Sequence, residues 1–273
     1  MPNKPSTKPP DAPRLVPGLW FRRNPSRNEH FVARGAVLLF DGDLREVISY
    51  DPGAEADLLE EFSDIGALAA SGDGVQYAIC RFAEKYGPLG YFHFHEQPVA
   101  GEPIGWTEAH ARGVHAALRL RALLDGGQDR ETRKYLDTIW DGPRFGECGR
   151  TRPLKFWSAY RDANAVPQLA LQVICHLVSP NIEGLRWALS ESSGSPRLEM
   201  RYGALLEFIY WQVAQRVARE GRVKICRNCG NVFLTENVRA EFCLPLPGAT
   251  FSRCRSAFNN RMHHKRAKKD LRK

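Results

Sequence analysis

The strongest constraint on how this chain folds is a cluster of cysteines near its C-terminal end. Four of the seven cysteines in the 273 residues fall within 29 positions, whereas the other three are scattered. The odd total and the lack of an apolar export segment near the first residue argue against a disulfide framework. Four reduced thiols so close in sequence are typical of a metal site. Their spacing is Cys226-x2-Cys229-x13-Cys243-x10-Cys254.

The first pair of cysteines favours a metal-binding knuckle. Only two residues separate Cys226 from Cys229, so both sulfurs can reach one ion from a tight turn, and Gly230 suits that turn because it adopts positive φ without a Cβ clash. The apolar segments on either side, 223–225 and 232–234, predict two short strands. A redox pair would instead open a helix after a core strand. Two inert buried thiols would leave the downstream cysteines unexplained.

The four cysteines together match a structural zinc site. Four thiolates at about 2.3 Å complete the tetrahedron of Zn²⁺ and leave no open position for chemistry. Cys254 is the expected fourth ligand because it opens a predicted helix, and a helix N-terminus stabilises a thiolate. His263 and His264 are the alternatives. A knuckle followed by a ligand at a helix start predicts a treble-clef-like zinc finger that holds one Zn²⁺.

The positive charge of the chain is concentrated beside these cysteines. The net charge is +8, yet the first 220 residues hold 26 basic and 28 acidic groups, while residues 221–273 hold 13 basic and 3 acidic groups. Such a density of cations is favourable beside a polyanion, since each neutralised phosphate releases counterions. The alternatives are a solvated tail and a tail that binds an acidic membrane or protein surface. We predict nucleic-acid contacts from Arg255, Arg261, Lys265, Arg266, Lys268 and Lys269, with Phe258 and Met262 packing against the finger.

The remaining sequence predicts an α+β chain in three parts. Residues 1–13, rich in Pro and Lys, predict a disordered leader, residues 14–220 a predominantly helical body with a small N-terminal β element, and residues 221–273 the finger with its basic helix. No run of about 18 apolar residues occurs, so we expect a cytoplasmic protein without a membrane partner. Within the body we expect helices over 54–62, 73–87, 106–124, 131–140, 167–177, 182–189 and 202–220, a hairpin over 36–50 joined at Asp41-Gly42, and a strand over 90–96.

The end of the chain resembles a known family. The run LLEFIYWQVAQRVAREGRVKICRNCGNVF, followed by EFC, a further cysteine and an Arg/Lys-rich end, is similar to the C-terminal region of bacterial CGNR-type zinc-finger proteins. That family is described as stress-induced transcription regulators with an N-terminal ABATE domain. The resemblance covers about residues 200–273 and implies zinc ligation by the four cysteines and a nucleic-acid role. The family's Cys-Gly-Asn-Arg signature follows its last cysteine, whereas Arg255 follows Cys254 here, so the chain resembles a member or a close cousin.

Other residues with chemical potential have simpler explanations. His93 and His95 lie on one face of the predicted strand, next to Glu96, but no third metal ligand is near in sequence, and we expect an exposed strand face. His110 is expected in the core, and the pair Cys175–His176 is expected to pack. No phosphate-binding loop, nucleophile elbow or paired-carboxylate motif is present.

The sequence therefore favours a nucleic-acid-binding protein over an enzyme. We expect DNA binding by a bacterial transcription regulator, with a body that senses a small-molecule or protein signal or forms a homodimer. RNA or ribosome association through the same finger is the second hypothesis. A metal-dependent nuclease is the least favoured, because the finger's turn carries Arg227, Asn228 and Asn231 where a catalytic histidine is needed.

Overall fold

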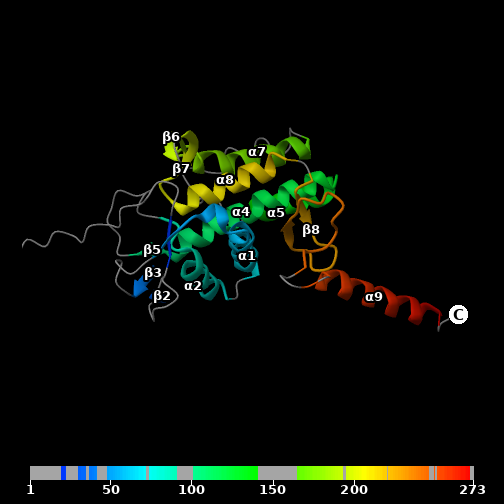
Figure 1. Cartoon of the computed structure of the whole chain (residues 1–273). Coiled ribbons are helices and arrows are strands. Elements are labelled where there is room, and N and C mark those ends of the chain that lie inside the picture. The colour runs from blue at the N-terminus through cyan, green and yellow to red at the C-terminus, as the bar shows by residue number, and fades with distance from the viewer. Residues whose placement is uncertain are drawn as a thin grey trace, which may run out of the picture.

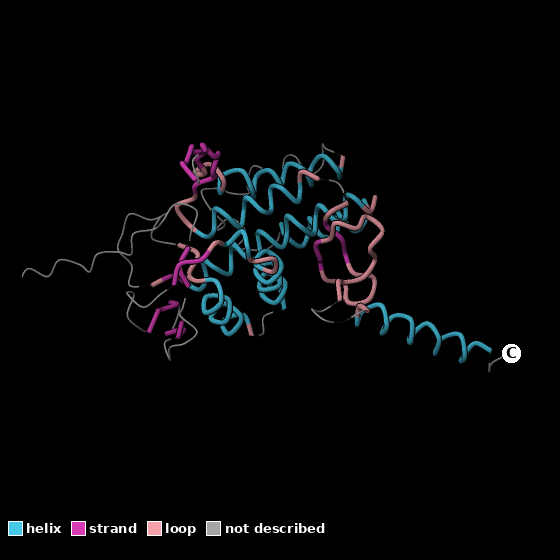
Figure 2. Tube along the Cα trace, viewed as in Figure 1, coloured by secondary structure: helices cyan, strands magenta, loops and turns pink. Residues whose placement is uncertain are grey.

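The computed structural model describes the chain as a mostly helical protein with a few short strands, as the α+β prediction required (Figures 1 and 2). The α-helices in the described residues are α1 (Leu58–Ser71), α2 (Val75–Tyr86), α4 (Ile104–Asp125), α5 (Asp129–Trp140), α7 (Val166–Val178), α8 (Leu205–Val217) and α9 (Arg253–Asp270). The described residues are 20–22, 30–34, 37–41, 48–71, 74–90, 101–140, 165–192, 195–219, 221–245, 249 and 251–270.

Helix α4 is the central element of the body. It contacts α1, α2, α5, α7 and α8 along its length, and its alanines and all its leucines except Leu124 are buried. The contact with α1 is especially close: a Cβ on Gly66 would lie 2.1 Å from the carbonyl oxygen of Ala111, so only glycine fits there. The predicted helix over 54–62 is therefore too short, since α1 continues to Ser71 along this contact.

The core helix predicted before the finger is confirmed as α8, although it begins at Leu205 and not at 202. Its buried side chains include Leu206, Ile209 and Val213. Tyr210 is also fully buried, and its hydroxyl lies 3.0 Å from Nδ1 of His110, which is 1% exposed. His110 is thus a hydrogen-bonded core residue, as expected.

The β elements differ from the predicted hairpin over 36–50. The strands β3 (Val37–Asp41) and β4 (Ile48–Tyr50) both exist, but they do not pair with each other. Strand β3 lies between β2 (His30–Arg34) and β5 (Glu102–Pro103), and β4 pairs with β1 (Trp20–Arg22), all antiparallel. The turn motif predicted that β3 pairs with the strand that follows it, whereas β3 pairs with the strand that precedes it and with the distant β5, and β4 pairs with the distant β1. The Gly42 turn itself lies outside the described residues.

The helix predicted over 182–189 is wrong. A 3-10 turn, η5 (Ser179–Asn181), ends α7, and the chain then enters strand β6 (Arg186–Ser192), which pairs in a regular antiparallel register with β7 (Ser195–Arg201). Trp187 of β6 meets Trp211 of α8 edge-on, with ring centroids 6.1 Å apart. The paired strands are thereby attached to the core helix.

Some of the predicted features fall on residues that the structure does not describe. The leader 1–13, the first residue of the predicted helix over 73–87, and His93, His95 and Glu96 lie outside the described residues. Cys175 is exposed on α7, so its predicted packing role is wrong. None of the described helices has both the length and the apolar character needed to cross a membrane.

Candidate metal centre

The knuckle is a tight turn between two short strands. Strands β8 (Val223–Ile225) and β9 (Val232–Leu234) pair antiparallel, as predicted from the flanking apolar segments. The amide of Cys226 donates to the carbonyl of Asn231 at 2.9 Å, and the amide of Gly230 donates back to the carbonyl of Cys226 at 2.9 Å. Gly230 has φ +77°, with no atom crowding its missing Cβ, so backbone conformation alone selects glycine here.

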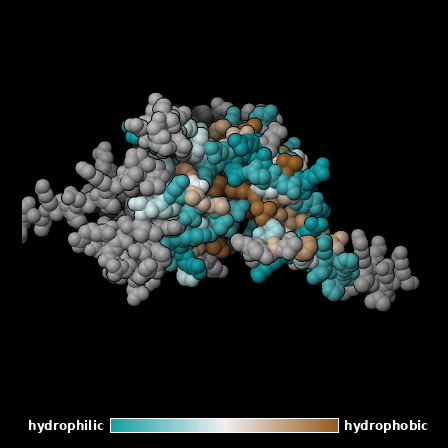
Figure 3. Space-filling model, viewed as in Figure 1, coloured by the Kyte–Doolittle hydropathy of each residue, from teal (hydrophilic) through white to brown (hydrophobic). Residues whose placement is uncertain are grey.

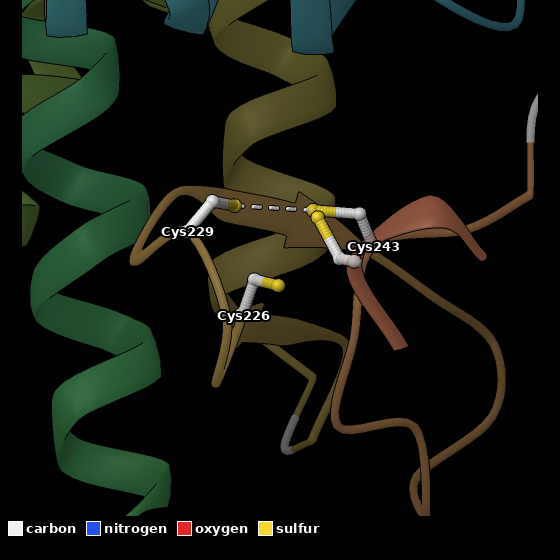
Figure 4. A group of neighbouring side chains, drawn as sticks. Cys226, Cys229 and Cys243 are labelled. Carbon is white, nitrogen blue, oxygen red and sulfur yellow. Dashed lines mark hydrogen bonds between the residues drawn. The ribbon is translucent and has the colours of Figure 1, made fainter. Parts of the chain in front are cut away.

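The four predicted cysteines converge on one point. The sulfurs of Cys226, Cys229, Cys243 and Cys254 all lie within 4.8 Å of one another, and those of Cys229 and Cys243 are 3.6 Å apart. Figure 4 shows the three labelled cysteines directing their sulfurs into a shared space. The 3.6 Å separation is far longer than a disulfide bond of about 2.05 Å. It is close to the roughly 3.8 Å between sulfurs that a tetrahedral ion with about 2.3 Å metal–sulfur bonds requires. The cluster can hold a metal ion.

The electrostatics of the cluster favour a cation at its centre. Burial raises the pKa of Cys226, but the backbone amides of Cys229, Cys243 and Asn228 outweigh that effect and lower it to about 6. Burial and the neighbouring sulfurs of Cys226 and Cys229 raise the pKa of Cys243. Four thiolates in this volume repel one another, and a divalent cation among them reverses that cost. The donor set therefore fits a thiophilic metal.

The fourth sulfur comes from the start of a helix, as predicted. Cys254 is the second residue of α9, and Ser252 caps that helix: its hydroxyl oxygen accepts from the amide of Arg255 at 3.3 Å, and its carbonyl accepts from Ser256 at 3.1 Å. His263 and His264, the alternative ligands, are exposed farther along α9 and are not part of the cluster. The arrangement thus favours Cys254.

The module is attached to the body through several polar contacts. The amide of Gly221 donates to Oδ2 of Asp125 at 2.8 Å, at the end of α4. Glu236, after β9, pairs with Arg216 of α8 at 2.5 Å and also with Arg222. Val223 is fully buried in the body's core cluster. The finger therefore shares a core with the body.

Helix α9 leaves the finger and extends away from the body (Figure 1). Phe258 is half-buried: its ring centroid lies 5.3 Å from that of Phe242 and 5.4 Å from the guanidinium carbon of Arg227. Met262 is 38% exposed, so its predicted packing on the finger is wrong. Figure 3 shows hydrophilic residues along the described part of this helix.

The predicted nucleic-acid contacts fall into three groups on α9. Arg255 is exposed near the helix start. Arg261 is also exposed, but its Nη2 donates to the carbonyl and to the side-chain oxygen of Asn228, and it therefore links α9 to the knuckle. The helix continues to Asp270 and so includes Lys265, Arg266, Lys268 and Lys269, whose side chains are outside the described set.

Sequence reasoning missed a hollow beside the metal cluster. Arg239 and Phe251 line it together with Arg255, and it opens between the 237–245 segment and the start of α9. No local pattern marks it, because its two walls come from segments that meet only in the folded chain.

Comparisons of the chain with protein-family models, with curated proteins and with solved structures give no match.

Proposed function

We propose that this protein binds nucleic acid through a treble-clef-like zinc finger and its basic helix, and that it acts as a DNA-binding transcription regulator of the CGNR type. The observation that carries the proposal is a long polar helix whose second residue, Cys254, belongs to the metal cluster and which extends away from the body. Zn²⁺ is the metal that suits four thiolates in a closed tetrahedral site.

The shape of α9 suits a groove of duplex DNA. Its 18 residues correspond to a length of about 27 Å. The major groove of B-DNA, about 12 Å wide, admits one helix, whereas the major groove of duplex RNA is too narrow for side chains to read. Every residue from Arg255 to His264 except Phe258 is exposed, so several faces of the helix remain accessible.

The charge distribution supports the same surface. Residues 221–273 carry a net charge of +10, and the first 220 residues a net −2. The body is therefore assigned a different role, either in sensing a signal or in dimerisation. Asp125 and Glu60 of the body hydrogen-bond to the finger. A change in the body could therefore shift the finger and, with it, α9.

The test is the salt dependence of duplex DNA binding by the zinc-loaded protein. If about four to six cations contact phosphates, log K should fall with log salt at a slope of roughly −4 to −5. Changing Lys268 and Lys269 to Ala should weaken all sequences alike and flatten the slope by about one to two units. The double change of Arg133 and Lys134, exposed on α5, removes the same charge from the body and should leave the slope unchanged.

Two outcomes would redirect the proposal. Affinity for structured RNA well above that for duplex DNA at equal salt would favour the RNA alternative. Millimolar affinity for every nucleic acid at physiological salt would leave α9 as a solvated tail and refute the function.

A further inference from the structure

The hollow beside the metal cluster is a second binding feature of the finger. It is a groove of about 360 Å³, within the size range of small-ligand sites. Its walls come from the segment after β9 and from the start of α9. The lining residues that matter for its chemistry are Arg239, Phe242, Leu244, Phe251, Ser252 and Arg255.

The groove combines exposed apolar groups with uncompensated positive charge. Phe251 is 70% exposed and Leu244 is 53% exposed, so a large aromatic face and an aliphatic neighbour meet solvent at its rim. Arg239 and Arg255 are both exposed, and neither guanidinium has a carboxylate partner among the described residues. The carboxylate of Glu241, also in the lining, is paired with Arg227 at 2.8 Å.

Resting on the proposed function, we infer that this groove receives one unpaired nucleobase, which stacks on Phe251 while Arg239 and Arg255 contact its flanking phosphates. Proteins that bind single strands combine an aromatic platform for a base with cations for the backbone. A base inside an intact duplex is stacked on both faces and cannot reach a phenyl ring at the base of α9. The ligand is therefore a single-stranded segment or a base extruded from a helix.

The metal cluster links the two walls of this groove. Cys243 lies in the wall formed by the segment after β9, and Cys254 lies one residue before Arg255 in the other wall. Both sulfurs belong to the same four-cysteine cluster. Metal bound at the cluster would hold Phe251 and Arg239 at a fixed separation, so base binding should depend on the metal.

The test compares the zinc-loaded full chain on a fluorescent 12-nucleotide dT strand and on a 12-base-pair duplex by anisotropy. Phe251→Ala should weaken single-strand binding about 5- to 150-fold, since stacking on an aromatic side chain contributes about 1–3 kcal/mol per base. Duplex binding should change less than about twofold, and Phe251→Trp should retain single-strand affinity. The matched control is Val238→Ala, which removes an apolar side chain, 60% exposed, that is not in the groove lining.

The outcomes separate this inference from the proposed function. Duplex binding with the expected salt slope, together with a Phe251→Ala variant that binds the single strand as well as Val238→Ala does, would overturn the groove assignment alone. Binding of an acidic, phenylalanine-containing peptide in place of the strand would also overturn it. Failure to bind either nucleic acid would refute the proposed function itself. A cross-link from 5-iodouracil in the strand to Phe251, found by mass spectrometry, would support the stacked base directly.

Discussion

The backbone amide of Leu234, in the finger, donates a hydrogen bond to Oε1 of Glu60, in α1, at 2.8 Å across 174 residues of sequence. Amides of successive strand residues point alternately to the partner strand and away from it. Because the amide of Thr235 donates to Arg222, the amide of Leu234 faces away from β8, towards the body. The Glu60 carboxylate therefore accepts from an outward-facing amide of β9 and joins the finger to α1.

Glu60→Ala should loosen the finger from the body. The substitution leaves the half-buried Leu234 amide without its acceptor, at a cost of about 1–3 kcal/mol. Glu60→Gln keeps an acceptor oxygen and should be far less destabilising. Chemical unfolding, with hydrogen exchange at residues 232–235, would measure both effects. Equal destabilisation by Ala and Gln would show that the charge, and not the hydrogen bond, makes the connection.

The same residue gives a pH dependence with a definite sign. Burial raises the pKa of Glu60 above its ordinary value of 4.5, although the Leu234 amide lowers it in part. The folded state then binds more protons than the unfolded state just above pH 4.5, so the free energy of unfolding should fall as pH rises through that window. Glu60→Gln lacks this titration, and its stability relative to the natural chain should increase over the same window. If the difference in the free energy of unfolding between Glu60→Gln and the natural chain stays constant from pH 4 to pH 7, the pKa of Glu60 is not raised by folding.

The purified protein should contain about one zinc per chain, as a closed four-thiolate site requires. Cys229→Ser should release the ion and unfold the finger while the helices of the body persist, as elemental analysis and circular dichroism would show. Cys175→Ser is the matched control, because Cys175 is exposed on α7 outside the cluster. If Cys254→Ser retains zinc but His263→Ala or His264→Ala loses it, the fourth ligand is a histidine.

Features fixed by local chemistry were the ones that the sequence predicted well. Helix α2 ends at Gly87, the last residue of the helix predicted over 73–87, which has φ +84° and donates its amide to the carbonyl of Ala83. The cysteine knuckle followed from a two-residue spacing and Gly230. Both depend on neighbours a few positions apart, so sequence alone determines them.

The strand pairings were predicted less well. Leu185, Trp187 and Leu189 alternate as a strand requires, and β7 begins at Ser195, shortly after β6 ends at Ser192, so the helix predicted over 182–189 overlooked a local hairpin pattern. Strand β3 pairs with the preceding β2 but also with the distant β5, and β4 pairs with the distant β1, and such distant partners are not visible in a local turn motif. The groove at Phe251 was missed for the same reason, since its walls meet only after the four cysteines converge.

Acid should destabilise the body through His115. Burial, together with the nearby charge of Arg119, lowers the pKa of His115 to about 4 from an ordinary value of 6.5. Between these values the unfolded state takes up a proton that the folded state refuses, so stability should fall by about 3 kcal/mol as pH drops from 6.5 to 4. His115→Gln should remove that slope relative to the natural chain, with urea unfolding followed at several pH values.

The control for His115 is its hydrogen-bond partner. The Oγ of Ser63 lies 3.2 Å from Nδ1 of His115, whereas the group of Ser63 that raises the pKa of His115 belongs to its backbone. Because Ser63→Ala keeps that backbone group, it should preserve the pH dependence while lowering stability overall. If the fall in stability between pH 6.5 and pH 4 is absent in Ser63→Ala, a group other than His115 titrates.

Phe258 should hold α9 in place, and Met262 should not. The helix carries few apolar groups and many like charges, and such a helix is marginal in water without a packing contact. Phe258 supplies that contact through Phe242 and Arg227, whereas Met262, one turn further, is exposed.

Phe258→Ala removes a half-buried ring, a loss of about 1–2 kcal/mol. Amide protection in the second half of α9 and duplex DNA affinity should each fall roughly 5- to 30-fold. Met262→Ala should change both less than about twofold, because a side chain left in water loses little packing on truncation. Zinc content should be unaffected in both variants, since neither residue is a ligand. Equal effects of the two substitutions would mean that Cys254 and the Arg261–Asn228 contact alone position the helix.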